Sequence, residues 1–452
     1  MVPTSPMTWR QGAVCYRRRL QHLCTCVFFF NRICIAIGFA LGNIVIVWTI
    51  YTVPMSSSSP FSSLRAPSTA LELTSFTDEI VAMHKPFCLD GKPAKYYFAR
   101  GSKENEDNFI IFFQGGGWCY THEECLLRSR TRLGSPRFLS STRSARTLLS
   151  ANPEENPEFY AYQRVYVPSC DGASFSGSRN EPVEGLWYRG KHIIDAVLEQ
   201  IGATKAAKNV LVTGCSAGGL AAFLHADYIR QQLPHSNLQR FKVLPSSGFF
   251  LFHNSVYGEP IFEAQMKHVF EMQNVSTSLN QKCLAAMPHH DAYKCFSAAA
   301  TLPFIESPTF IYNSAYDEWM INCIVAVDKS TGCRNAIGWE PCAKNLKQCD
   351  AMQLSTLHEH ANAMLAEMAR GGAFSRPGNG VFIHSCWQHC MLNTEGLWGM
   401  LQIHNTTAKE AILAWWQAEP AADARDHVYL PCQILPGKEC NPSCAGVSVS
   451  RQ

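Results

Sequence analysis

The chain has 452 residues, of which 17% are charged, with 39 lysines and arginines against 36 aspartates and glutamates. This length allows one large domain or two ordinary ones. The near balance of charge excludes the broad basic surface of a nucleic-acid-binding protein, so no nucleic-acid partner is expected.

The N-terminal part differs in composition from the rest of the chain. Residues 1–32 contain five arginines and no acidic residue, residues 33–53 carry no charge, and residues 54–70 are rich in serine and proline. An uncharged run of this length can cross a bilayer as a helix, and its basic side stays in the cytoplasm. We therefore expect a cytoplasmic tail (1–32), a transmembrane signal anchor (33–53), a stem (54–70) and a folded domain (71–452).

This order predicts a single-pass type II membrane protein whose folded domain is lumenal or extracellular. A cleaved signal peptide, which would release a secreted protein, is the alternative. Cysteine usage agrees with an oxidising compartment, because 16 of the 20 cysteines follow the apolar run and an even number suits disulfides. Three of the other four, Cys15, Cys24 and Cys26, are candidates for palmitoylation. Asn274 and Asn405 begin glycosylation sequons.

From residue 71 onward, apolar runs of strand length alternate with helical patterns, which predicts an α/β fold with a mostly parallel sheet. The expected strands are 96–100, 109–113, 163–168, 210–213, 241–244, 309–312 and 380–383, and the expected helices are 123–132, 190–201, 217–232, 351–370 and 407–417, with a mixed helical insertion over 253–305.

The segment around Ser216 carries the strongest chemical signal. Residues 214–218 read Gly-Cys-Ser-Ala-Gly, between an apolar β-branched run and a helical pattern. A Gly-x-Ser-x-Gly turn from strand to helix exposes the serine as a nucleophile. Ser216 is therefore the candidate nucleophile of a hydrolase.

Such a serine needs a base and an acid that follow it in the chain, in the order of α/β-hydrolases. Asp317 comes directly after the 309–312 strand, although an N-cap role for the next helix is the simpler interpretation. His384 and His389 both follow the 380–383 strand, and position alone does not choose between them.

The histidines do not indicate a metal site. His358 and His360 point to different faces of their helix, where we expect both at the surface, and no His-Glu-x-x-His motif occurs. Residues 114–119 read Gln-Gly-Gly-Gly-Trp-Cys after a buried strand but lack the lysine of a phosphate loop. This loop lies where a serine hydrolase has its second oxyanion donor. No metal and no cofactor are expected.

Five motifs together resemble the pectin acetylesterase family, which also includes the Notum carboxylesterases. They are Gln-Gly-Gly-Gly-Trp-Cys at 114–119, Cys-Asp-Gly-Ala-Ser-Phe at 170–175, Gly-Cys-Ser-Ala-Gly-Gly at 214–219, Asn-Ser-Ala-Tyr-Asp at 313–317 and Ser-Cys-Trp-Gln-His-Cys at 385–390. The resemblance spans roughly residues 80 to 432 and is closer to the plant-type members. It implies an α/β-hydrolase-like fold, a triad of Ser216, Asp317 and His389, a structural role for His384, and backbone oxyanion donors at Gly117, Trp118 and Ala217.

The sequence departs from the family after the 241–244 strand. Ser246 and Ser247 stand before Gly248-Phe249-Phe250, where the family usually has an aspartate. This departure leaves the triad intact and changes the polarity of the loop.

Cysteine spacing suggests several disulfides. Cys119 with Cys125 would close a short loop, and Cys88 with Cys170 would tie the start of the domain to the strand before Asp171. Cys215 and Cys390 flank two proposed catalytic residues. Cys283 with Cys295 is a local candidate within the insertion, and Cys323, Cys333, Cys342 and Cys349 form a cysteine-rich loop.

The expected function is that of a serine ester hydrolase which removes O-acetyl groups from a polysaccharide or glycan through an acyl-enzyme. A Notum-like deacylase that removes a fatty acyl ester from a protein is the alternative within the enzyme class. A catalytically inactive glycan-binding module is the alternative from another class. We expect a monomer attached to the membrane through its N-terminal anchor.

Overall fold

A computed structural model describes residues 13–17, 24–30, 33–40, 43–44, 70–328, 332–393, 397–419, 421–438 and 440–446. The chain divides into two compact units, Met1–Arg65 and Ala66–Gln452. All candidate site residues lie in the second unit.

The first unit contains a four-stranded antiparallel sheet, and the structure differs here from the predicted membrane helix. No helix in the described ranges is both long and apolar enough to cross a bilayer. Strands β3 and β4 occupy part of the 33–53 run, and β3 pairs with β2 in an antiparallel ladder. Residues 41–42 and 45–53 of that run, like most of the tail and the stem, lie outside the described residues. The strands are β1 (Ala13–Arg17), β2 (Cys24–Phe30), β3 (Ile33–Ala40) and β4 (Asn43–Ile44).

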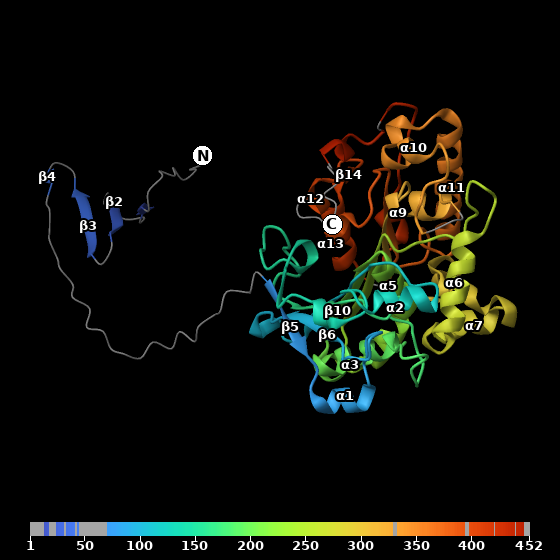
Figure 1. Ribbon diagram of the computed structural model, residues 1–452. Helices are drawn as coiled ribbons and strands as arrows, with labels where there is room; N and C mark the ends of the chain where they lie inside the picture. The colour runs from blue at the N-terminus through green and yellow to red at the C-terminus, as the bar shows by residue number, and fades with distance from the viewer. Residues whose placement is uncertain are drawn as a thin grey trace. The chain divides into compact units, whose positions relative to one another are not determined.

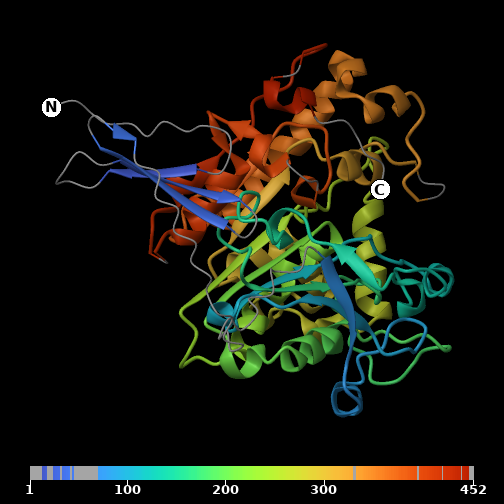
Figure 2. The same ribbon diagram turned by 90° about the vertical axis from the view of Figure 1, so that its left-hand side faces the viewer.

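The second unit is built on a ten-stranded sheet with the order β16-β13-β12-β11-β10-β7-β9-β6-β5-β8. The seven strands from β16 to β9 are parallel, and β6, β5 and β8 add an antiparallel edge. Figure 2 shows strands of this sheet side by side. The strands are β5 (Ala70–Ser75), β6 (Lys95–Ala99), β7 (Asn108–Phe113), β8 (Thr142–Ser144), β9 (Gln163–Val167), β10 (Asn209–Cys215), β11 (Arg240–Ser246), β12 (Phe310–Ser314), β13 (Gly380–His384) and β16 (Val428–Tyr429), and a separate hairpin joins β14 (Gln402–Ile403) to β15 (Thr406–Thr407).

Helices cover both faces of the sheet, because alternate residues of each buried strand point to opposite faces. On β10, Val210 and Val212 belong to the core cluster that includes residues of α3, α5 and α11, whereas Leu211 belongs to the cluster that includes the tryptophans of α13. In Figure 1, α1 and α3 lie at one end of this unit, and α10 and α11 lie at the other. The helices are α1 (Asp78–His84), α2 (His122–Arg128), α3 (Gly190–Gln200), α4 (Ala203–Ala206), α5 (Ala217–Gln232), α6 (Ile261–Met272), α7 (Gln281–Ala286), α8 (Ala298–Thr301), α9 (Glu318–Met320), α10 (Glu340–Lys344), α11 (Ala351–Arg370), α12 (Leu397–Met400) and α13 (Ala408–Gln417).

The prediction of a mostly parallel α/β sheet is confirmed, and α5 and α11 have the predicted bounds. Strands β5, β8 and β16 were not predicted, because they are short or lie at the antiparallel edge. The prediction of a surface position for His360 is wrong, because this residue is buried on the same face of α11 as Leu357 and Met364. Burial lowers the pKa of His360 to about 3, so this side chain is a neutral core residue.

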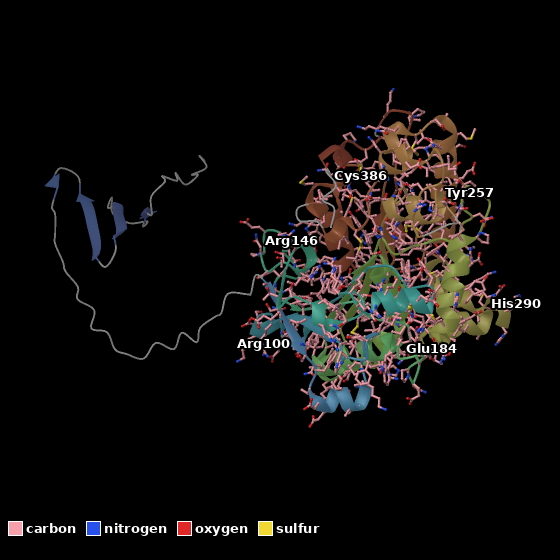
Figure 3. The ribbon with its side chains drawn as sticks, in the orientation of Figure 1. Arg100, Arg146, Glu184, Tyr257, His290 and Cys386 are labelled. Carbon is pink, nitrogen blue, oxygen red and sulfur yellow. A yellow bond between two sulfur atoms is a disulfide. The ribbon has the colours of Figure 1, made fainter. Side chains whose placement is uncertain are left out.

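Disulfides join all 16 cysteines of the described part of the second unit. By contrast, polar residues such as Arg100, Glu184 and His290 are exposed at its outside (Figure 3). The structure pairs Cys88 with Cys170, Cys119 with Cys125, Cys215 with Cys390 and Cys283 with Cys295, the partners that spacing suggested, and adds Cys323–Cys333, Cys342–Cys349, Cys386–Cys444 and Cys432–Cys440.

The approach of α5 to the sheet gives a test of the fold. A Cβ atom added at Gly218 would lie 2.1 Å from the carbonyl oxygen of Phe113 on β7. We expect Gly218→Ala to lower the free energy of unfolding by at least about 2 kcal/mol, because the helix must move away from the strand. Gly399→Ala in α12 is the control, since its nearest neighbour would be 4.0 Å away. Calorimetric melting of both variants checks this, and equal melting temperatures would contradict the close approach.

Candidate active site

Ser216 lies at the turn between β10 and α5. Its backbone is left-handed in φ (62°), a conformation that a side chain other than glycine adopts only under constraint. The Ser216 N–H donates to the carbonyl oxygen of Ser246 (3.0 Å), and a Cβ at Gly115 would lie 2.6 Å from the Ser216 Cβ. Two neighbouring segments therefore hold this turn in its strained form.

Asp317 is buried at the end of the loop that follows β12. Its carboxylate accepts the backbone N–H groups of Trp319 (3.0 Å) and Met320 (3.1 Å), which makes it the N-cap of α9. The same carboxylate accepts a hydrogen bond from His389 at 2.8 Å. The carboxylate therefore caps α9 and contacts His389 at the same time.

His389 lies in the loop after β13, with 17% of its side chain exposed. Because a carboxylate only accepts hydrogen bonds, the Nδ1 atom donates to Asp317, and in a neutral ring the lone pair then belongs to Nε2. The Nε2 atom is buried and has no hydrogen-bond partner among the described residues. This is the tautomer that a general base needs, and contacts between base and nucleophile commonly tighten only when substrate binds.

The disulfide between Cys215 and Cys390 brings the nucleophile turn and the base loop together. It joins the residue before Ser216 to the residue after His389, with their Cα atoms 5.6 Å apart. The hydroxyl of Ser247 accepts the N–H of Cys390 (3.0 Å). Ser247 is one of the two serines by which the sequence departs from the family pattern, and it supports the loop that carries His389.

His384, the other histidine after the same strand, lies elsewhere. It is the last residue of β13 and is 1% exposed, and its ring lies against Tyr312 with centroids 5.4 Å apart. Burial lowers its pKa to about 3, which keeps the ring neutral. The structure therefore pairs His389, not His384, with the acid.

The proposed oxyanion donors lie on two segments next to Ser216. Ala217 is the first residue of α5, and Gly117 and Trp118 belong to the glycine loop after β7. Within the described part of the chain, no recorded hydrogen bond uses the N–H groups of these three residues. They are available to a ligand, as an oxyanion hole requires.

Four aromatic side chains pack beside His389, and no sequence pattern indicated that their rings would meet there. We call Trp118, Phe250, Phe262 and Trp319 the aromatic cluster. Each ring contacts the other three, with centroids 5.1 to 6.1 Å apart. Phe250 and Trp319 also lie 6.3 and 6.4 Å from the His389 ring. No local pattern could reveal this cluster, because its members come from four separate segments.

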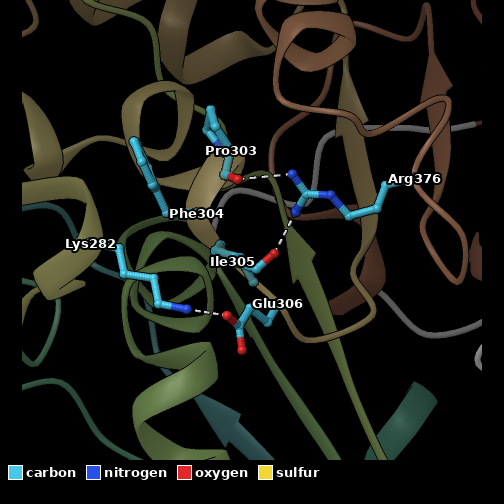
Figure 4. Close-up of a pocket in the computed structure, with 6 residues that line it drawn as sticks. All are labelled: Lys282, Pro303, Phe304, Ile305, Glu306 and Arg376. Atoms are coloured by element: carbon cyan, nitrogen blue, oxygen red, sulfur yellow. Dashed lines mark hydrogen bonds and ion pairs between the residues drawn. The ribbon is translucent and has the colours of Figure 1, made fainter. Parts of the chain in front are cut away.

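Two cavities lie away from the triad. One, of about 400 Å³, is bordered by the Lys282–Glu306 ion pair and by Arg376, whose guanidinium donates to the carbonyls of Pro303 and Ile305 (Figure 4). The other, of about 350 Å³, is lined by residues of α6, α8 and α11 and by the segment after Phe250. Neither cavity is lined by Ser216, Asp317 or His389.

Comparison with known proteins agrees with the predicted resemblance. The family model described as Pectinacetylesterase matches residues 70–440. Pectin acetylesterase 5 of Arabidopsis thaliana is 32% identical and the match covers 90% of this chain and 93% of the relative. The palmitoleoyl-protein carboxylesterase Notum of Schmidtea mediterranea is 25% identical over 73% of this chain and 60% of its own length.

The solved structure of the Wnt deacylase Notum from Drosophila shares the fold, with a TM-score of 0.65 and 21% identity, over 83% of this chain and 99% of that structure. With the family model matched over most of its length, the chain belongs to the pectinacetylesterase family.

Proposed function

We propose that this carboxylic ester hydrolase removes O-acetyl groups from a polysaccharide or glycan, with Ser216 as nucleophile, His389 as base and Asp317 as the orienting acid. The observation that carries the proposal is the His389–Asp317 contact beside the strained Ser216 turn. The carbohydrate part rests on the pectin acetylesterases among the relatives.

The reaction follows from the positions of these groups. His389 Nε2 takes the proton of the Ser216 hydroxyl while the serine oxygen bonds to the ester carbon. The N–H groups of Gly117, Trp118 and Ala217 receive the negative oxygen. When the carbon–oxygen bond to the sugar breaks, His389 returns the proton to the sugar oxygen. Water then attacks the acetyl-serine by the same route and releases acetate.

The aromatic cluster favours a short acyl group. A fatty acyl chain needs a long apolar tunnel beside the nucleophile. Here four mutually packed rings occupy the space next to His389, and Phe250 and Phe262 are 2% and 1% exposed. An acetyl group needs no such tunnel, so we rank acetate esters above the fatty acyl esters named for the Notum relatives.

The first test of the proposal is the triad. We expect Ser216→Ala to abolish ester hydrolysis and His389→Ala to lower kcat/KM by about 10³-fold or more. Asp317→Asn should have a similar effect while leaving the fold in place, because asparagine caps α9 as well as aspartate does. The measurement is hydrolysis of p-nitrophenyl acetate by variants with wild-type melting temperatures.

His384→Ala is the control for these variants, and we expect it to retain most of the activity. If His384→Ala were inactive and His389→Ala were active, the assignment of His389 as the base would be wrong. Failure of a fluorophosphonate to label Ser216 in the wild type would favour a catalytically inactive binding module instead.

The second test is acyl length. We expect kcat/KM on p-nitrophenyl esters to fall from acetate to octanoate, and Phe262→Ala to raise the octanoate-to-acetate ratio about tenfold by opening the aromatic cluster. Phe159→Ala is the matched control, because Phe159 is equally buried but packs against Tyr162 and Trp416 in the other core. A wild-type preference for octanoate would support the fatty deacylase instead.

We also propose that the catalytic unit lies in the secretory lumen or outside the cell, attached through the N-terminal segment. The disulfides of the second unit support an oxidising compartment. Asn274 and Asn405, the two sequon asparagines, are exposed. The attachment itself rests on the basic tail and the uncharged run of residues 33–53.

For intact microsomes, we expect the catalytic unit to resist added protease until detergent is present. Its electrophoretic mobility should increase on glycosidase treatment, and this increase should be lost in a variant with both Asn274→Gln and Asn405→Gln. Digestion without detergent, together with unmodified asparagines, would place the unit in the cytosol.

A further inference from the structure

Arg128 is a charged side chain that has no role in the proposed triad. It is the last residue of α2, and the Cys119–Cys125 disulfide ties this helix back to the glycine loop. Exposed arginines, such as Arg100 in Figure 3, point into solvent. Arg128 instead bonds to carbonyl groups of the glycine loop. Its guanidinium therefore contacts backbone that is distant from it by ten or more residues.

The guanidinium donates to successive carbonyl groups of the glycine loop. It bonds to the carbonyl oxygens of Gly116 (2.9 Å), Gly117 (3.2 Å) and Trp118 (3.4 Å), and its Nε atom donates to Leu133 (3.1 Å). A planar guanidinium with several fixed donors suits such a set of acceptors, which a flexible ammonium cannot hold in one geometry. The bonds therefore fix the orientation of consecutive peptide planes.

These orientations determine where the loop's N–H groups point. In a planar trans peptide, the carbonyl and the N–H of the next residue point in opposite directions. The Gly116 carbonyl faces Arg128, so the N–H of Gly117 points away from it, and the Gly117 carbonyl directs the N–H of Trp118 away in the same manner. Both N–H groups are proposed oxyanion donors, and both are without a partner among the described residues.

Arg128 lies beside a buried carboxyl group, that of Asp171. Burial lowers the pKa of Arg128, and the interaction with Asp171 opposes that shift. The carboxylate of Asp171 accepts the N–H of Phe175 (3.2 Å). The carbonyl oxygen of the next residue, Gly172, accepts the N–H of Cys119 (3.2 Å). The carboxylate and the guanidinium thus belong to one packed set of loops.

We propose that Arg128 is a positioning residue for ester hydrolysis, which orients the Gly117 and Trp118 N–H groups as oxyanion donors by binding the carbonyls behind them. This inference rests on the proposed serine hydrolase function but not on the identity of the acyl group. It predicts that losing the guanidinium weakens stabilisation of the transition state more than binding of the substrate.

We expect Arg128→Met to lower kcat about 100-fold, in the range seen for loss of an oxyanion donor, while KM changes less than about threefold. The inhibition constant of a trifluoromethyl ketone, whose hemiketal oxygen mimics the oxyanion, should rise by the same factor as kcat/KM falls. Arg128→Lys should lie between wild type and Arg128→Met. Arg130→Met, an exposed arginine on the adjoining segment, is the matched control and should behave as wild type.

Active-site titration with a fluorophosphonate separates positioning from a purely structural role. If Arg128 only stabilised the fold, the fraction of reactive serines would fall and kcat per labelled site would stay within about threefold of wild type, which would overturn the proposal. An increase in KM without a fall in kcat would overturn it as well. If Arg128→Met does not fold, Arg128→Lys decides, and a wild-type kcat in that variant contradicts the proposal.

The same variants are compared on whichever ester the wild type hydrolyses fastest. A wild-type preference for octanoate would therefore reject the acetyl assignment and leave the test of Arg128 intact. A normal kcat in Arg128→Met on acetate would reject the role of Arg128 and leave the acetyl assignment intact.

Discussion

The covalent link between Cys215 and Cys390 is the constraint on which the site depends. The proposed nucleophile and base lie next to these two cysteines, which are 175 residues apart, one at the end of β10 and the other after β13. The sheet places the carboxyl ends of both strands at one edge, as in other open α/β folds. The disulfide then holds Ser216 and His389 near each other, and the hydroxyl of Ser247 stabilises the same loop from the neighbouring strand.

Around this link, single residues serve both structure and chemistry. Asp317 caps α9 and orients His389 with one carboxylate, so the helix start and the acid cannot move independently. Trp118 supplies a proposed oxyanion N–H and a ring of the aromatic cluster, and its indole N–H donates to Ser174 at 2.8 Å. A substitution at either position would therefore alter the fold and the site together.

The aromatic cluster and Arg128 concern two separate properties, acyl specificity and reaction rate, which family membership does not distinguish. The family includes relatives named for acetyl esters and relatives named for palmitoleoyl esters. Four packed rings beside His389 bear on which acyl group fits, because a filled space excludes a long chain. The bonds of Arg128 to the glycine loop bear on rate, because donors oriented in advance do not have to reorganise during the reaction.

Sequence alone determined the parallel strands, the Ser216 turn and the position of Asp317, because each is encoded in a short run whose pattern is local. It misjudged His360, since two histidines on one helix differ only in what packs against them. The residue pattern also did not distinguish His384 from His389 as the candidate base. The family resemblance implied His389, and the tertiary structure shows the physical difference, because it buries His384 against Tyr312 and places His389 on Asp317. The aromatic cluster and the Arg128 bonds likewise depend on contacts between segments, which no local pattern specifies.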